Sequence, residues 1–147
     1  MATRKAYVKQ LSGITFAGRT EQTNHWVMWD GPETFGGSNA AIRPKELLLL
    51  SLAGCTASDV VAILQKKRVN FHDFEMNITA EETEEHPKVY KSINLEYVVY
   101  GTNVKAKDVE RAIELSQDKY CGVTEMLRHS VEITHTYKIV DTAEEKN

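Results

Sequence analysis

Hydrophobic and polar residues alternate along several short segments of the chain, which is the pattern of half-buried β-strands. Three segments near the N-terminus, AYVKQL, ITFAGRT and HWVMWD, carry the β-branched and aromatic residues that strands favour. Further along, residues 74–83 and 92–101 flank the connection EEHPK, which predicts a β-hairpin. Residues 131–140, VEITHTYKIV, predict a closing strand.

A long helix is predicted from Pro44 to about Arg68, because proline is favoured in the first helical turn and apolar residues dominate the segment after it. These apolar residues point in every direction around the helix, so we expect it to be buried on most sides. A chain of this size cannot easily wrap such a helix alone, and we infer a homodimer. The run Leu47–Cys55 is broken by Ser51, and we expect no membrane span here.

Two further helices are predicted before the closing strand. Residues 106–120 place apolar residues at helical spacing, with Thr102 or Asn103 as the expected cap. A short helix is expected to start near Cys121. The order of elements indicates an α+β fold, which we expect to form a single domain over 1–147 with a polar tail at 141–147. The Gly- and Pro-rich residues 31–44 predict a long loop.

Charge and composition exclude several classes of protein. The formal net charge of the 147 residues is −3, and no basic stretch is interleaved with aromatic residues, so we expect no nucleic-acid partner. The N-terminus has no apolar core typical of a secretion signal. Two cysteines are too few for a secreted disulfide scaffold. These observations predict a cytoplasmic protein that binds neither nucleic acid nor membrane.

The two cysteines, Cys55 and Cys121, are the candidate reactive groups. Cys121 follows Lys119 at an expected helix start, where an anion is favoured. Cys55 shares a helix face with Asp59, whose negative charge opposes a thiolate, so activation of Cys55 requires a cation from elsewhere. Inert packing of both thiols is an open alternative, since free cysteine is among the most buried residue types. A zinc site that adds His129 and His135 lacks paired-ligand spacing, and we expect no metal.

Two stretches, RPKELLLLSLAGCTASDVVAIL at 43–64 and LSQDKYCGVTEMLRHSVEITHTY at 115–137, resemble the OsmC/Ohr family, and its OsmC-like branch more than its organic hydroperoxide resistance branch. The segment FAGRTEQTNHWVMWD and the order of elements agree with this resemblance. The resemblance implies an OsmC-like fold, with an antiparallel sheet packed on a long central helix and two chains intertwined as a homodimer.

The resemblance also implies a thiol peroxidase for organic hydroperoxides, a function in oxidative-stress defence. Cys55 matches the peroxidatic cysteine, which becomes a sulfenic acid, and Cys121 matches the resolving cysteine, which forms a disulfide with it. An external thiol or lipoyl reductant is implied, and no metal or organic cofactor. Arg19 is the best match for an arginine that stabilises the thiolate.

The glutamate that holds this arginine is where the chain departs from the family. The family's Pro-Glu pair is Pro44-Lys45 here, and Glu46 follows one residue later. Glu46 is therefore the candidate for this role, and equally an acidic residue that favours the helix N-terminus. Two other functions stay open: a redox sensor without turnover, and a module that binds a small lipophilic ligand with incidental thiols.

Overall fold

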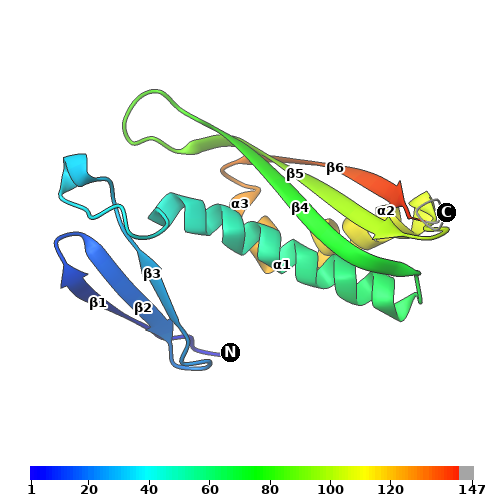
Figure 1. Ribbon diagram of the computed structural model, residues 1–147, viewed down its shortest axis with the longest axis horizontal. Coiled ribbons are helices and arrows are strands. Elements are labelled where there is room, and N and C mark those ends of the chain that lie inside the picture. The colour runs from blue at the N-terminus through cyan, green and yellow to red at the C-terminus, as the bar shows by residue number, and fades with distance from the viewer. Residues whose placement is uncertain (143–147) are drawn as a thin grey trace. The chain divides into compact units, whose positions relative to one another are not determined.

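The computed structural model describes residues 1–142, and contacts within the chain divide it into two units, 1–49 and the residues from Leu50 onward. Each unit has its own three-stranded sheet and is described by itself. Strands, helices and their order agree with an α+β fold (Figure 1). Residues 143–147 of the expected polar tail lie outside the described residues. Asp141, where the tail was expected to begin, belongs to the last strand. That the chain is one domain stays a prediction.

The first unit is built on the antiparallel sheet β1-β2-β3, from strands Ala6–Ser12, Thr15–Thr20 and Trp26–Trp29. Tyr7, Arg19 and Trp26 are direct cross-strand neighbours, so their side chains share one face of the sheet. On the other face lie Val8 and Val27, and both are about half exposed, at 55% and 47%. This sheet therefore exposes apolar side chains on both faces within the unit.

The loop after β3 is organised by one buried carboxylate. Asp30 is 1% exposed and accepts hydrogen bonds from the backbone N–H groups of Gly31, Ser38 and Ala40 at 2.7 to 3.1 Å. The bond from Ala40 is the main cause that lowers the pKa of Asp30. The predicted loop therefore has a defined conformation, which also contains the short 3-10 helix Glu33–Phe35.

Helix α1 spans Pro44–Lys66 and begins where the sequence predicts. Glu46 accepts a hydrogen bond from the backbone N–H of Arg43 at 3.1 Å, which satisfies one of the free donors of the first turn. The residues it buries share one face: Leu52, Ala53, Thr56, Val60 and Leu64. Leu50 on this helix is 55% exposed within the chain, so the expected burial on most sides requires a second subunit and stays a prediction.

By length and composition alone, α1 could cross a membrane, which the shorter run Leu47–Cys55 did not suggest. One such helix is weak evidence, because core helices of soluble proteins pass the same test. Its buried face includes the hydroxyl of Thr56, which is hydrogen-bonded to two other buried polar side chains, Tyr97 and Ser116. On this face α1 therefore contributes to the core of the second unit.

The second unit contains the sheet β4-β5-β6, from strands Phe71–Glu82, Tyr90–Gly101 and Glu132–Asp141. β4 and β5 form the predicted antiparallel hairpin. β5 and β6 pair in parallel, so the expectation of a purely antiparallel sheet is wrong. A parallel pair needs a crossover connection, and the segment between these two strands provides it.

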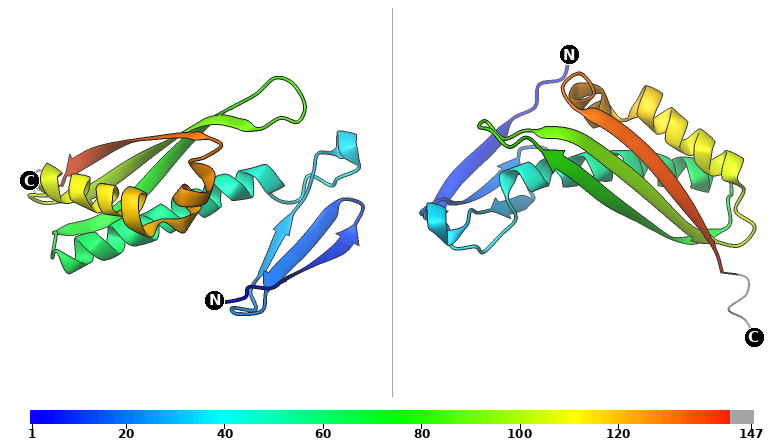
Figure 2. Two further views of the ribbon diagram at one scale, coloured as in Figure 1. Left: turned by 180° about the vertical axis from the view of Figure 1, so that it is seen from behind. Right: turned by 90° about the horizontal axis from the view of Figure 1, so that it is seen from above.

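That crossover consists of α2 (Ala106–Leu115), the π-helical turn Ser116–Tyr120 and α3 (Gly122–Leu127). The predicted cap of α2 is wrong: the helix begins after Lys105, which makes no side-chain capping bond. The prediction for α3 is confirmed, since Cys121 is its N-cap. Both α2 and α3 lie on the same side of the sheet as α1 (Figures 1 and 2).

The core of the second unit combines apolar packing with a buried polar network. Its largest fully buried side chains come from α1, β5 and α2, and Tyr97 on β5 is the largest of them. The Tyr97 hydroxyl lies 2.6 Å from Thr56 Oγ1 and accepts a hydrogen bond from Gln117 Nε2 at 3.0 Å. These bonds join a helix, a strand and the π-helical turn at one point.

Replacing Tyr97 with Phe should therefore destabilise the protein by about 1–2 kcal/mol, because Thr56 and Gln117 lose a buried partner. Urea unfolding measures this change. The matched control is Tyr100→Phe on the same strand, whose hydroxyl bonds the exposed Glu75 at 2.9 Å, and it should cost less than about 0.5 kcal/mol. Equal losses of unfolding free energy in the two variants would contradict a stabilising role of the buried network.

Candidate functional site

Cys55 and Cys121 lie together with Asp59 in the second unit. The two Sγ atoms and a carboxylate oxygen of Asp59 all lie within 4.8 Å of one another. Both cysteines are free thiols; Cys121 is 3% exposed, and Cys55 and Asp59 are half-buried. The structure thus brings together two residues that the sequence offered as a redox pair, and adds the carboxylate that the sequence placed on the face of Cys55.

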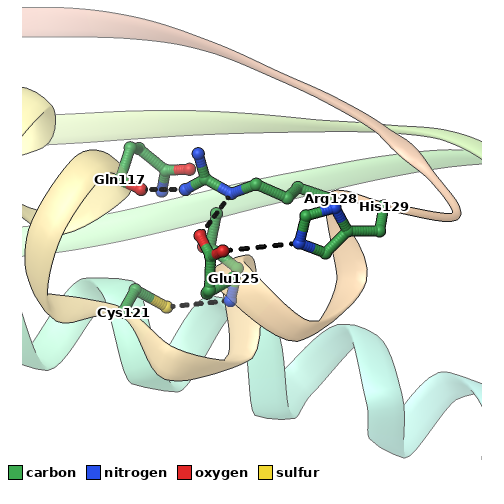
Figure 3. A network of polar contacts seen from close by, with 6 residues as sticks. Gln117, Cys121, Glu125, Arg128 and His129 are labelled. Atoms are coloured by element: carbon green, nitrogen blue, oxygen red, sulfur yellow. Dashed lines mark hydrogen bonds and ion pairs between the residues drawn. The ribbon is translucent and has the colours of Figure 1, made fainter.

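The π-helical turn and the short helix after it position Cys121. The backbone N–H of Cys121 donates to the carbonyl oxygen of Ser116 at 2.8 Å, which closes the turn. Cys121 then caps α3, since its Sγ accepts a hydrogen bond from the N–H of Thr124 at 3.4 Å (Figure 3). The position of Cys121 is therefore fixed by two hydrogen bonds, one from its backbone N–H to Ser116 and one from the Thr124 N–H to its thiol.

Asp59 is oriented by the polar network of the core. The hydroxyl of Ser116 donates to Asp59 Oδ2 at 2.9 Å and lies 2.8 Å from Thr56 Oγ1. Thr56 follows Cys55 directly on α1, and Ser116 begins the turn that ends before Cys121. The same hydrogen bonds that hold α1 and the turn together thus set the positions of both thiols and of the carboxylate.

The electrostatics of the cluster oppose a thiolate on Cys55. Burial is the largest cause that raises the pKa of the Cys55 thiol, and the nearby Cys121 and Asp59 raise it further. A hydrogen bond from the backbone N–H of Val123 acts in the other direction. The predicted opposition by Asp59 agrees with this direction, and the need for a cation near Cys55 stays a prediction.

A hollow of about 260 Å³ opens beside Cys121 and is lined by residues 117–122 and Glu125. Glu125 also forms an ion pair with Arg128 at 2.9 Å and lies 3.4 Å from His129 (Figure 3). His129 is thus engaged with Glu125, and His135 lines a different hollow. The cluster at the thiols contains a carboxylate and neither of these histidines.

Arg19 and Glu46 belong to the first unit, and their proposed catalytic roles stay predictions. Arg19 donates a hydrogen bond to Asn24 and lies over the rings of Tyr7 and Trp26, at 6.0 and 5.5 Å from their centroids. Glu46 accepts the capping bond from Arg43. Among the described residues, these two candidate side chains therefore contact different partners and not each other.

Sequence reasoning missed the network that supports the thiols, above all Thr56, Tyr97 and Gln117. One signal was present: Ser116 occurs at a position of the predicted helix where the spacing calls for an apolar residue. A polar residue on an apolar face is buried only with a hydrogen-bond partner, and Ser116 is indeed fully buried with two. The identity of its partners depends on pairing between segments far apart in the chain.

Comparison with known proteins identifies the family. The model of the family described as OsmC-like protein matches residues 36–136. Protein YhfA of Escherichia coli strain K12 is 40% identical over 136 residues, which cover 92% of this chain and 98% of YhfA. A crystal structure of a hypothetical protein from Aquifex aeolicus VF5 is 29% identical, covers 96% of this chain and 98% of that one, and superimposes with a TM-score of 0.83.

A more distant structure is the organic hydroperoxide resistance protein OsmC of Legionella pneumophila, also described as a predicted redox protein. It is 16% identical, covers 94% of this chain and 98% of that one, and has a TM-score of 0.66, so it shows a shared fold. The extent of the family match and the identity to YhfA carry the assignment. The chain belongs to the OsmC-like protein family.

Proposed function

We propose that this protein is a cysteine-dependent peroxidase that reduces organic hydroperoxides in the cytoplasm. The observation that carries the proposal is the meeting of Cys55 and Cys121, whose sulfur atoms lie within 4.8 Å although they come from α1 and from the start of α3. Two free thiols at this separation need only a small movement to form a disulfide, in which the S–S bond is about 2.05 Å.

In the proposed reaction, the Cys55 thiolate attacks the terminal oxygen of the hydroperoxide. The S–O bond forms as the O–O bond breaks, and the alkoxide takes up a proton and leaves as the alcohol. Cys55 is then a sulfenic acid. The Cys121 thiolate attacks the Cys55 sulfur, the disulfide forms, and hydroxide leaves as water after protonation. An external thiol or lipoyl dithiol supplies the two electrons that restore the free thiols.

Arg19 is our candidate for the cation that this reaction requires. Without it, the raised pKa of Cys55 leaves only a small thiolate fraction at neutral pH. A guanidinium that reaches Cys55 would favour the thiolate and could donate to the departing oxygen. Glu46 is the candidate to hold this arginine, although its carboxylate already accepts the capping bond from Arg43. A weakly held arginine predicts a slower peroxidase.

A homodimer is part of the proposal. Large apolar side chains are exposed in both units, among them Val8 (55%), Trp26 (51%) and Leu50 (55%). Side chains of this kind, exposed on both faces of a sheet and along a helix, are typical of surfaces that a second subunit covers. We place the substrate pocket at that interface. The alternatives, a redox sensor and a ligand-binding module, differ from the peroxidase in that neither consumes hydroperoxide in the steady state.

Stoichiometric oxidation is the most direct test of the peroxidase. One equivalent of cumene hydroperoxide added to the reduced protein should remove two hydrogen atoms within seconds, as measured by intact mass under non-reducing conditions. Cys121→Ser should instead stop at a sulfenic acid that reacts with dimedone, and Cys55→Ser should not react. Two free thiols after minutes in the wild-type protein would contradict the peroxidase proposal.

Replacing Asp59 with Asn should make Cys55 more reactive, because it removes a negative charge that raises the thiol pKa. The pKa of the Cys55 thiol is raised in the folded protein, so the thiolate fraction is low at pH values below that pKa. This fraction grows about tenfold per pH unit as the pH approaches the pKa. Alkylation of Cys55 by iodoacetamide at pH 7, followed by peptide mass, should accelerate several-fold in the variant.

The matched control for this experiment is Asp108→Asn. Asp108 bonds Lys67 at 2.9 Å, and Lys67 is twelve positions from Cys55, about 18 Å along a helix. Its neutralisation should leave the alkylation rate of Cys55 unchanged. A rate in Asp59→Asn equal to that of the wild-type protein would show that another charge sets the reactivity of Cys55.

The role of Arg19 is tested by Arg19→Gln, which should slow oxidation of Cys55 on the order of 100-fold, the effect of losing one donor aimed at developing charge. Stopped-flow oxidation with cumene hydroperoxide gives the rate. Arg111→Gln is the control, since Arg111 forms an exposed ion pair with Glu114 on α2. Equal rates for wild type and both variants would remove Arg19 from the mechanism.

A further inference from the structure

We propose that the reduced cluster of Cys55, Asp59 and Cys121 binds a thiophilic divalent cation such as Zn²⁺ or Cd²⁺. The inference concerns a ligand that is neither oxidised nor reduced, so it does not depend on peroxidase activity. It also differs from the zinc site that the sequence suggested and rejected, because the third ligand is a carboxylate four residues after Cys55 and not a histidine.

The distances suit a small d¹⁰ cation. With Zn–S bonds of about 2.3 Å and Zn–O bonds of about 2.0–2.2 Å, ligand atoms of a tetrahedral site lie about 3.5–3.8 Å apart. The three candidate atoms lie within 4.8 Å of one another before any ion is bound. Movements of about 1 Å close the site. Three protein ligands leave the fourth position to water or to another small ligand.

Each ligand already has an outer hydrogen-bond donor. The N–H of Thr124 donates to Cys121 Sγ at 3.4 Å, and the N–H of Val123 bonds the Cys55 thiol. The Ser116 hydroxyl donates to Asp59 Oδ2 at 2.9 Å. Donors of this kind orient metal ligands and stabilise the negative charge that they carry. Ser116 is itself fully buried and hydrogen-bonded to Thr56, so the carboxylate is held in place.

Electrostatic attraction provides the driving force for binding of the cation. Two thiols and a carboxylate converge at this point, so two thiolates and a carboxylate would repel one another without a cation between them. A divalent cation among them replaces this repulsion by attraction. Binding releases one proton from each thiol and leaves two thiolates and a carboxylate on the ion, with a net charge of −1 and no change in oxidation state. One of the three ligands, Cys121, lines the hollow described above.

The test uses Cd²⁺ as the probe, because thiolate ligands give it a charge-transfer absorption in the ultraviolet. Titration of the reduced full-length protein should saturate at one ion per chain and release about two protons per ion. Cys55→Ser and Cys121→Ser should each lose about half of the absorption. Asp59→Asn should keep both thiolates and lose affinity by at least about tenfold. Asp108→Asn should match the wild-type protein.

The wild-type protein supplies a second readout that does not depend on the folding of any variant. One equivalent of Zn²⁺ should protect both thiols from alkylation, a chelator should restore their reactivity, and protein oxidised to the disulfide should bind neither ion. The proposal is overturned if the single cysteine variants retain wild-type affinity, if Asp59→Asn binds as tightly as the wild type, or if no ion binds the reduced protein.

Discussion

The hydrogen bonds of Thr56 are the constraint on which the functional part of this structure depends. Its hydroxyl contacts Tyr97 at 2.6 Å, Ser116 at 2.8 Å and Gln117 at 3.1 Å, and all four side chains are buried. In an apolar core, an unpaired hydroxyl or amide costs more free energy than a paired one gains, so these groups specify one relative placement of helix, strand and turn.

That placement decides the proposed chemistry, because the candidate reactive residues are sequence neighbours of the network. Cys55 precedes Thr56, and Cys121 donates its backbone N–H to the carbonyl of Ser116. The π-helical turn is part of the arrangement: it directs the side chains of Ser116 and Gln117 inward and ends at the N-cap of α3, where Cys121 stands. π-helical segments are frequent at functional sites.

The cluster that results has a chemical character of its own. Its two thiols and its carboxylate are all electron-pair donors in a partly buried place, where Cys121 and Asp59 oppose ionisation of Cys55. The repulsion between negative charges at such a site is removed when the two thiols form a disulfide. It is also reduced by a cation supplied from elsewhere in the protein or by a bound metal ion. The proposed peroxidase chemistry uses the first two routes, and the proposed cation site uses the third.

The sequence by itself determined the order of elements and identified the two thiols as the candidate reactive groups. Periodicity and proline placed α1, the hairpin β4–β5, the helix start at Cys121 and the last strand, because these signals are local. The motifs around the cysteines identified the family, which the comparisons establish. The tertiary structure decided what no local pattern encodes: the parallel pairing of β5 with β6, the polar network around Thr56, and the approach of Cys121 to Cys55. These depend on contacts between segments distant in the chain, where hydrogen-bond partners are selected only once the core has formed.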